Sequence, residues 1–72
     1  MTFEEARQVR MLFGKYQGQT FDEIASTDEG LRYLDWLRGW FEERTLIWLT
    51  VREALAVYLS DPAIAADLER VI

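Results

Sequence analysis

In residues 29–41 the chain runs Glu29-Gly30-Leu31-Arg32-Tyr33-Leu34-Asp35-Trp36-Leu37-Arg38-Gly39-Trp40-Phe41, which has the apolar spacing of an amphipathic helix. At about 100° per residue, an arc of roughly 160° runs from Trp36 through Trp40, Tyr33, Leu37 and Phe41 to Leu34. Arg32, Asp35, Glu42 and Glu43 lie opposite this arc. The stretch therefore predicts a helix over 29–41 that buries one face and carries Trp36 at the rim between core and solvent.

Two further helices are expected downstream of this one. Residues 45–59 contain Arg52 and Glu53 as their only charges, and their apolar side chains cover an arc of about 220°. Asp61-Pro62 is typical of an N-cap followed by a proline in the first helical position. An apolar stripe then continues from Ile64 to the end of the chain. The first of these helices needs cover on two sides, and the second can supply part of it.

Two capping patterns predict short helices before residue 29. Thr2-Phe3-Glu4-Glu5 and Thr20-Phe21-Asp22-Glu23 each place a hydroxyl three residues before a glutamate, so that side chain and backbone can cap one another. We expect helices over residues 3–8 and 21–25.

The segment between these two helices predicts a β-hairpin. Val9, Met11 and Phe13 alternate with Arg10 and Leu12, and this period of two is typical of a strand. Gly14 and Gly18 supply a turn in which glycine adopts positive φ. The expected fold is therefore a single small domain over residues 1–72, mostly α (small α+β). It has a short N-terminal β-hairpin followed by three main helices and one minor helix, with the hairpin and first main helix in 9–41 and a C-terminal helical pair in 45–72.

Composition narrows the possible functions. Of 72 residues, 13 are acidic and 8 basic, which gives a net charge of −5 at pH 7 and disfavours strong nonspecific binding to duplex DNA. Cysteine and histidine are absent, which excludes thiol nucleophiles, disulfides, imidazole bases and the usual zinc ligands. We predict a protein that is not an enzyme, with no metal site and no cofactor.

The N-terminal sequence predicts a cytoplasmic location. Met1-Thr2-Phe3-Glu4-Glu5 carries two acids where a signal peptide would carry basic residues. No uncharged stretch approaches the ~20 residues that cross a bilayer. We expect no membrane partner.

The loop and the helix that follows share a pattern with a known family. Phe13-Gly14-Lys15-Tyr16-Gln17-Gly18-Gln19-Thr20, with Tyr33-Leu34-Asp35-Trp36-Leu37 downstream, resembles the small domain at the C-terminus of exodeoxyribonuclease X-like exonucleases. That domain also forms short standalone bacterial and phage proteins, some described as quorum-sensing-regulated virulence factors. The structural motif that carries the resemblance comprises Phe13, Gly14, Gly18 and Thr20. The resemblance covers residues 11–41 and implies a non-catalytic accessory role close to DNA processing.

Several positions differ from the family pattern. Gln17 and Gln19 stand where the family has lysine or arginine, so this loop carries less positive charge. Leu12 and Glu29 each replace a proline. The lower charge keeps open a function that involves no nucleic acid.

Two other patterns have structural explanations. Residues 14–20 contain glycines separated by three residues, whereas a phosphate-binding loop needs four and a lysine where this chain has Gln19. The pairs Asp22/Glu23 and Asp28/Glu29 could in principle hold magnesium, but both stand where helices begin, and capping explains them. We assign no catalytic residue.

Cations and aromatic rings on the loop and helix are the best binding candidates. Cations can follow a phosphate chain, while aromatic rings stack unpaired bases at ~1–3 kcal/mol each. These candidates are Arg10, Lys15, Tyr16, Arg32, Trp36 and Arg38. An ordinary solvated surface is the alternative for this set. Tyr33 and Trp40 lie inside the helical arc, where we expect core residues.

These observations favour a non-enzymatic accessory binding module of bacterial or phage DNA metabolism, with single-stranded nucleic acid or a DNA-processing protein as its partner. The alternative is an acidic protein-interaction factor, such as a small regulator or inhibitor of a host enzyme. We also expect a homodimer, because the wide apolar arc of residues 45–59 exceeds what two neighbouring helices cover. Its contact would include Trp48, Leu49 and Leu59. A helix buried centrally within one chain is the other explanation of that arc.

Overall fold

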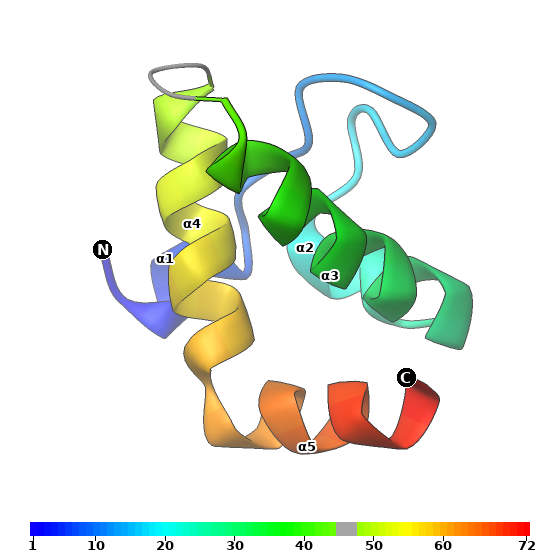
Figure 1. Cartoon of the computed structure of the whole chain (residues 1–72). Coiled ribbons are helices and arrows are strands. Elements are labelled where there is room, and N and C mark those ends of the chain that lie inside the picture. Colours follow the sequence, from blue (N-terminus) through cyan, green and yellow to red (C-terminus); the bar gives the residue numbers. More distant parts are fainter. Residues whose placement is uncertain (45–47) are drawn as a thin grey trace.

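The structure is a computed structural model that describes residues 1–44 and 48–72, and this part of the chain holds five helices (Figure 1). In chain order they are α1 (Phe3–Ala6), α2 (Phe21–Ile24), α3 (Asp28–Glu42), α4 (Leu49–Ser60) and α5 (Pro62–Val71). The helix α4 contacts α1, α3 and α5, and it therefore forms the centre of the fold.

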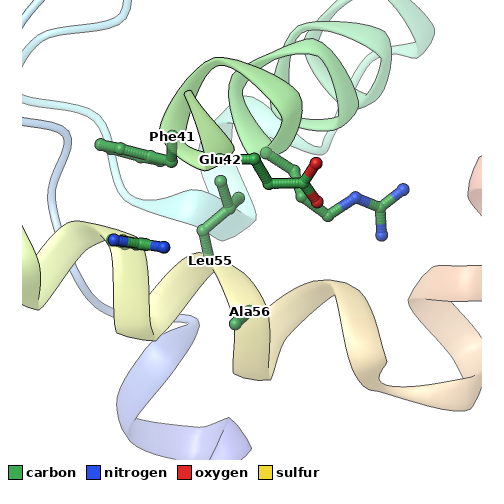
Figure 2. Close-up of a pocket in the computed structure, with 6 residues that line it drawn as sticks. Phe41, Glu42, Leu55 and Ala56 are labelled. Carbon is green, nitrogen blue, oxygen red and sulfur yellow. The ribbon is translucent and has the colours of Figure 1, made fainter. Parts of the chain in front are cut away.

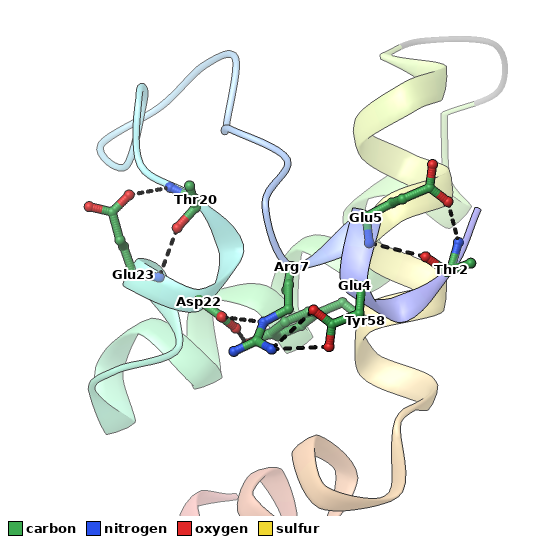
Figure 3. A network of polar contacts seen from close by, with 8 residues as sticks. All are labelled: Thr2, Glu4, Glu5, Arg7, Thr20, Asp22, Glu23 and Tyr58. Carbon is green, nitrogen blue, oxygen red and sulfur yellow. Dashed lines mark hydrogen bonds and ion pairs between the residues drawn. The ribbon is translucent and has the colours of Figure 1, made fainter.

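Both predicted capping boxes are confirmed at the starts of α1 and α2 (Figure 3). The Thr2 hydroxyl accepts from the Glu5 backbone N–H at 3.2 Å, and the Glu5 carboxylate accepts from the Thr2 N–H at 2.9 Å. Thr20 and Glu23 form the same pair at 3.2 and 2.8 Å. These local bonds determine where the two single-turn helices begin.

The predicted helix over 29–41 is confirmed and extends one residue further at each end. The Thr27 hydroxyl caps it by accepting from the Gly30 N–H at 3.0 Å. Gly30 packs directly on the preceding helix, because a Cβ at that position would lie 1.7 Å from the carbonyl oxygen of Ile24. This close approach places α3 against α2.

The two C-terminal helices are also present. The described part of α4 begins at Leu49, and residues 45–47 of the predicted helix lie outside the described residues. Trp48 precedes α4 in the left-handed backbone region, with φ of 50°. Asp61 caps α5 as expected, because its carboxylate accepts from the backbone N–H groups of Ala63 and Ile64 at 3.1 and 3.3 Å.

The prediction of an N-terminal β-hairpin, and with it the small α+β class, is wrong. The described residues contain no strand and only an isolated antiparallel bridge between Arg10 and Thr20. The Met11 N–H donates to the Gln19 carbonyl at 2.8 Å, but the returning segment is too short to extend this pairing. The turn ends at Gly18 and α2 begins directly after Thr20, so a capping box takes the place of a second strand.

Parts of the reasoning behind the hairpin are nevertheless confirmed. Gly14 and Gly18 adopt positive φ values of 79° and 88°. The alternation also holds, since Met11 is buried while Arg10 and Leu12 are exposed. The segment is thus extended with alternating burial, although it forms no sheet.

The apolar arc of α4 is covered largely within one chain. Its buried side chains are Val51, Ala54, Leu55, Tyr58 and Leu59. Tyr58 stacks on Phe3 of α1 at 5.4 Å between ring centroids, and its ring meets that of Phe21 edge-on at 5.6 Å. A central helix with neighbours on several sides therefore accounts for most of the arc. Among the described residues, no helix has the length and apolar character needed to cross a membrane.

Candidate functional site

Six aromatic side chains form a continuous series of ring contacts along α3, which we call the aromatic strip. In order of contact they are Tyr16, Tyr33, Trp36, Trp40, Phe13 and Trp48. At one end, the ring centroids of Tyr16 and Tyr33 lie 4.8 Å apart, and those of Tyr33 and Trp36 lie 5.7 Å apart. The loop before α2 and the helix α3 therefore share one aromatic surface.

The second half of the strip connects α3 to the start of α4. Trp36 and Trp40 have ring centroids 6.5 Å apart, and Phe13 lies 5.6 Å from Trp40. Trp48 then stacks on Phe13 at 5.4 Å with an angle of 23° between the ring planes. Segments that are distant in sequence thus complete the strip.

Helical spacing and one glycine explain how the strip is assembled. Tyr33, Trp36 and Trp40 are three and four residues apart, so they lie on one face of α3. Gly14 lets the loop approach this face, because a Cβ there would lie 2.9 Å from the Tyr33 hydroxyl. Its positive φ is also a conformation that other residues rarely adopt.

The strip is packed on one side and open on the other. Trp36 is 57% exposed and Trp48 is 42% exposed. Phe13, Tyr16, Tyr33 and Trp40 are half-buried and pack against the core. The rings are therefore held in place while part of their surface stays in contact with solvent, which is the arrangement that stacking of a planar ligand needs.

Two cations lie against the strip, and each is paired with a carboxylate. Lys15 Nζ lies 5.3 Å from the Tyr16 ring centroid and 2.7 Å from Glu29 Oε1. That hydrogen bond raises the pKa of Lys15, which keeps its ammonium charged. The Arg44 guanidinium lies 4.2 Å from the Trp40 ring centroid, with Glu43 Oε2 3.6 Å from its Nη1. The site is thus aromatic, with positive charge that is largely balanced.

The structure brings together only part of the predicted binding set. Lys15, Tyr16 and Trp36 belong to the strip or touch it. The other three predicted cations make contacts elsewhere. Arg10 donates to the Gly18 carbonyl at 2.7 Å, Arg32 donates to the Val71 carbonyl at 3.4 Å, and Arg38 pairs with Asp35.

Sequence reasoning assigned four strip residues to other roles and overlooked Arg44. Phe13 was assigned to the structural motif, Trp48 to an oligomer contact, and Tyr33 and Trp40 to the core. The spacing of residues 33, 36 and 40 was the available signal, because it places three large rings on one helix face. The contacts of Phe13 and Trp48 depend on the tertiary fold.

The three residues predicted to form the oligomer contact differ in their exposure. Trp48 and its neighbour Leu49 are exposed, the latter by 55%. Leu59 is 4% exposed and belongs to the core of a single chain. A contact between two copies would therefore involve Trp48 and Leu49, while Leu59 is already covered.

Three of the four carboxylates considered as metal ligands have other partners, and Figure 3 shows two of these three, Asp22 and Glu23. Glu23 caps α2, and Asp22 accepts hydrogen bonds from the Tyr58 hydroxyl and from Arg7. Glu29 pairs with Lys15. Within the described residues, no cluster of three or more potential ligands could hold a metal ion.

Comparisons of the chain with family models, with curated proteins and with solved structures find no match.

Proposed function

We propose that this chain is a non-enzymatic accessory binding module of DNA metabolism, and that its aromatic strip stacks unpaired bases of single-stranded nucleic acid. The observation that carries the proposal is the unbroken series of ring contacts from Tyr16 to Trp48, with Trp36 more than half exposed. The faces of unpaired bases stack on such rings, whereas bases inside a duplex are already stacked on each other. The resemblance of residues 11–41 to an exonuclease-associated domain is in keeping with this role.

The size of the strip suits a few nucleotides better than a stable protein partner. A buried aromatic side chain contributes about 150–250 Å², so Trp36 and Trp48 together offer roughly 200 Å² of open surface. With the half-buried rings the strip falls in the range of about 300–600 Å² given for the largest apolar patch on a typical monomer, which is often functional. A standard protein interface needs about 800 Å² from each partner.

The charge balance predicts how binding responds to salt. Lys15 and Arg44 are the two cations that contact strip rings. Each phosphate contact on a single strand contributes about −0.7 to the slope of log K against log salt, so two contacts predict a slope of about −1.4. Stacking then supplies most of the affinity, and binding is weak at physiological salt.

Fluorescence anisotropy with a labelled oligothymidylate tests the proposal at about 20 mM salt, where charge screening is low. We expect weak binding by the wild type and a loss of about fivefold or more for Trp36→Ala, because base stacking is worth ~1–3 kcal/mol. Ile72→Ala is the matched control, because it removes another exposed apolar side chain, 71% exposed, that is not part of the strip. Unlabelled duplex of the same length should compete poorly.

Two results would contradict the proposal. One is the absence of binding at low salt, and the other is equal binding by wild type and Trp36→Ala. Either result favours the second candidate function, a protein-interaction factor. The observation behind that candidate is the exposure of Leu49 beside Trp48, and an apolar contact of this kind should be nearly indifferent to salt.

A further inference from the structure

A groove of about 230 Å³ lies between α3 and α4 (Figure 2). Its lining comes from both helices and comprises Arg38, Phe41, Glu42, Arg52, Leu55 and Ala56. At about 100° per residue, Arg38 lies roughly 160° around α3 from Trp36. The groove therefore opens on a different face of α3 from Trp36, although its lining residue Phe41 also contacts the strip rings of Phe13 and Trp40. The inference about it does not use the base stacking proposed above.

The floor of the groove is apolar. Phe41 and Leu55 line it although they are only 2% and 1% exposed, so the groove reaches down to the core. Figure 2 shows Leu55 pointing from α4 toward α3, near Phe41 and Glu42. Ala56 is exposed, and its small side chain leaves the groove open on the α4 side. This floor favours an apolar side chain.

The walls carry unpaired charge of both signs. Arg52 is half-buried and Glu42 is exposed, and within the described residues neither of them forms an ion pair, whether with the other or with a third group. Arg38, the third charged residue of the groove, is paired with Asp35. The groove thus presents one free cation and one free anion above an apolar floor.

We propose that this groove binds an apolar α-amino acid in its zwitterionic form. The ligand carboxylate pairs with Arg52, the ligand ammonium pairs with Glu42, and the side chain lies on Phe41 and Leu55. The groove, at about 230 Å³, is smaller than the pockets of about 300–1,000 Å³ that hold drug-sized molecules, so it suits a smaller ligand such as a single amino acid. A carboxylic acid that lacks the ammonium would leave Glu42 without a partner. An amine that lacks the carboxylate would leave Arg52 without one.

Amide chemical shifts of the isotope-labelled protein test this proposal, with L-leucine as the probe because it has no ring to stack on the strip. We expect saturable shifts at Arg52, Leu55 and Ala56. Two analogues lack one charge each: 4-methylpentanoate has no ammonium, and 3-methylbutylamine has no carboxylate. Each should bind more weakly, by up to about fivefold, as expected for the loss of one partly exposed ion pair.

Variants of the groove complete the test. Arg52→Gln and Glu42→Gln should each weaken leucine binding by about fivefold. Arg70→Gln and Glu69→Gln change the same residue types on the exposed surface of α5 and should leave binding unchanged. The proposal is overturned if leucine causes no shifts up to its solubility limit, or if the shifts lie outside the groove. It is also overturned if the singly charged analogues bind as well as leucine, or if the α5 variants weaken binding as much as the groove variants.

Discussion

The hydroxyl of Tyr58 donates a hydrogen bond of 2.8 Å to Asp22 Oδ1, and this contact joins the central helix α4 to the single turn of α2. The other oxygen of Asp22 accepts from Arg7 Nε at 2.6 Å, and Arg7 Nη1 also donates to Glu4 at 3.2 Å. Figure 3 shows these four side chains between α1, α2 and α4. One half-buried carboxylate therefore links three helices, in addition to the packing of Tyr58 on Phe3 and Phe21.

Removal of the Tyr58 hydroxyl should destabilise the fold. The ring of Tyr58→Phe keeps its packing on Phe3 and Phe21, but Asp22 loses one partner. A hydrogen bond to a partly exposed charged group is worth about 1 kcal/mol, which lowers the melting temperature of a domain of this size by about 4–8 °C. Thermal melting followed by circular dichroism measures the change. Ser60→Ala, which removes an exposed hydroxyl from the same helix, serves as the control, and equal losses in both variants would contradict the assigned role.

The burial of Tyr58 also predicts the titration of its phenol. Burial raises the pKa of Tyr58 above its ordinary value of 10.0, and the hydrogen bond to Asp22 raises it further. In the folded protein this tyrosine should therefore stay protonated under alkaline conditions that ionise an exposed tyrosine. Ultraviolet difference spectra of wild type and Tyr58→Phe isolate its contribution. Ionisation of Tyr58 near pH 10, before the protein unfolds, would show that the contact does not persist in solution.

The glycines should respond to alanine in opposite directions. Gly14→Ala and Gly18→Ala both place a side chain at positive φ, which costs about 1 kcal/mol. Gly14→Ala should cost more, because its Cβ would also press on the Tyr33 hydroxyl. Gly39 is the internal control: it lies within α3 with open space around its would-be Cβ, so Gly39→Ala should stabilise by about 0.5–1 kcal/mol. Denaturant unfolding ranks the three variants, and a neutral Gly14→Ala would contradict the loop geometry.

Acid should weaken both capping boxes. The backbone N–H of Thr2 lowers the pKa of Glu5 below its ordinary value of 4.5, and that of Thr20 does the same for Glu23. A carboxylate with a lowered pKa in the folded state contributes stability above its unfolded pKa and loses it as the pH falls through the folded value. The stability of the wild type should therefore decline below about pH 4.5.

The double variant Glu5→Gln/Glu23→Gln separates this effect from general acid unfolding. Glutamine can still accept the capping hydrogen bond but does not titrate. Its stability should change less steeply with pH in the acid range, as measured by denaturant unfolding at several pH values. An identical acid slope in wild type and double variant would show that other carboxylates dominate.

Self-association is tested most directly at Leu49. This side chain is 55% exposed next to Trp48, so Leu49→Glu should leave the fold intact. If two copies meet at this surface, the wild type should scatter light as a dimer, and the variant as a particle of 8.5 kDa. In a two-fold symmetric dimer both copies carry the substitution at the contact, so Leu49→Glu introduces two charges there. A wild type that stays at 8.5 kDa over micromolar concentrations would exclude the homodimer.

The helices were predictable from the sequence because their signals are local. Thr2, Thr20 and Asp61 each cap a helix through bonds to residues two or three positions away, and such pairs can be recognised without the fold. The expected hairpin, in contrast, required a second strand to pair with the first. The alternation in residues 9–13 reports burial correctly, but Thr20 starts a helix where the returning strand would have to continue.

The candidate site was predicted only in part, for a related reason. The face shared by Tyr33, Trp36 and Trp40 follows from helical spacing alone. The contacts of Phe13 with Trp40 and Trp48 join residues 27 and 35 positions apart in the sequence, and no local pattern indicates them. A half-buried ring packs against the core with one part and contacts solvent with the other. Trp40 can therefore pack on the core, as predicted, and also belong to the exposed aromatic strip.

The aromatic strip has a practical consequence for spectroscopy. The chain contains three tryptophans, and all of them, Trp36, Trp40 and Trp48, belong to the strip. Intrinsic tryptophan emission from this protein therefore originates from one surface and from none of the buried core. Its quenching would monitor occupancy of that surface without an added label, whereas an emission change on heating would report changes around α3 and the start of α4.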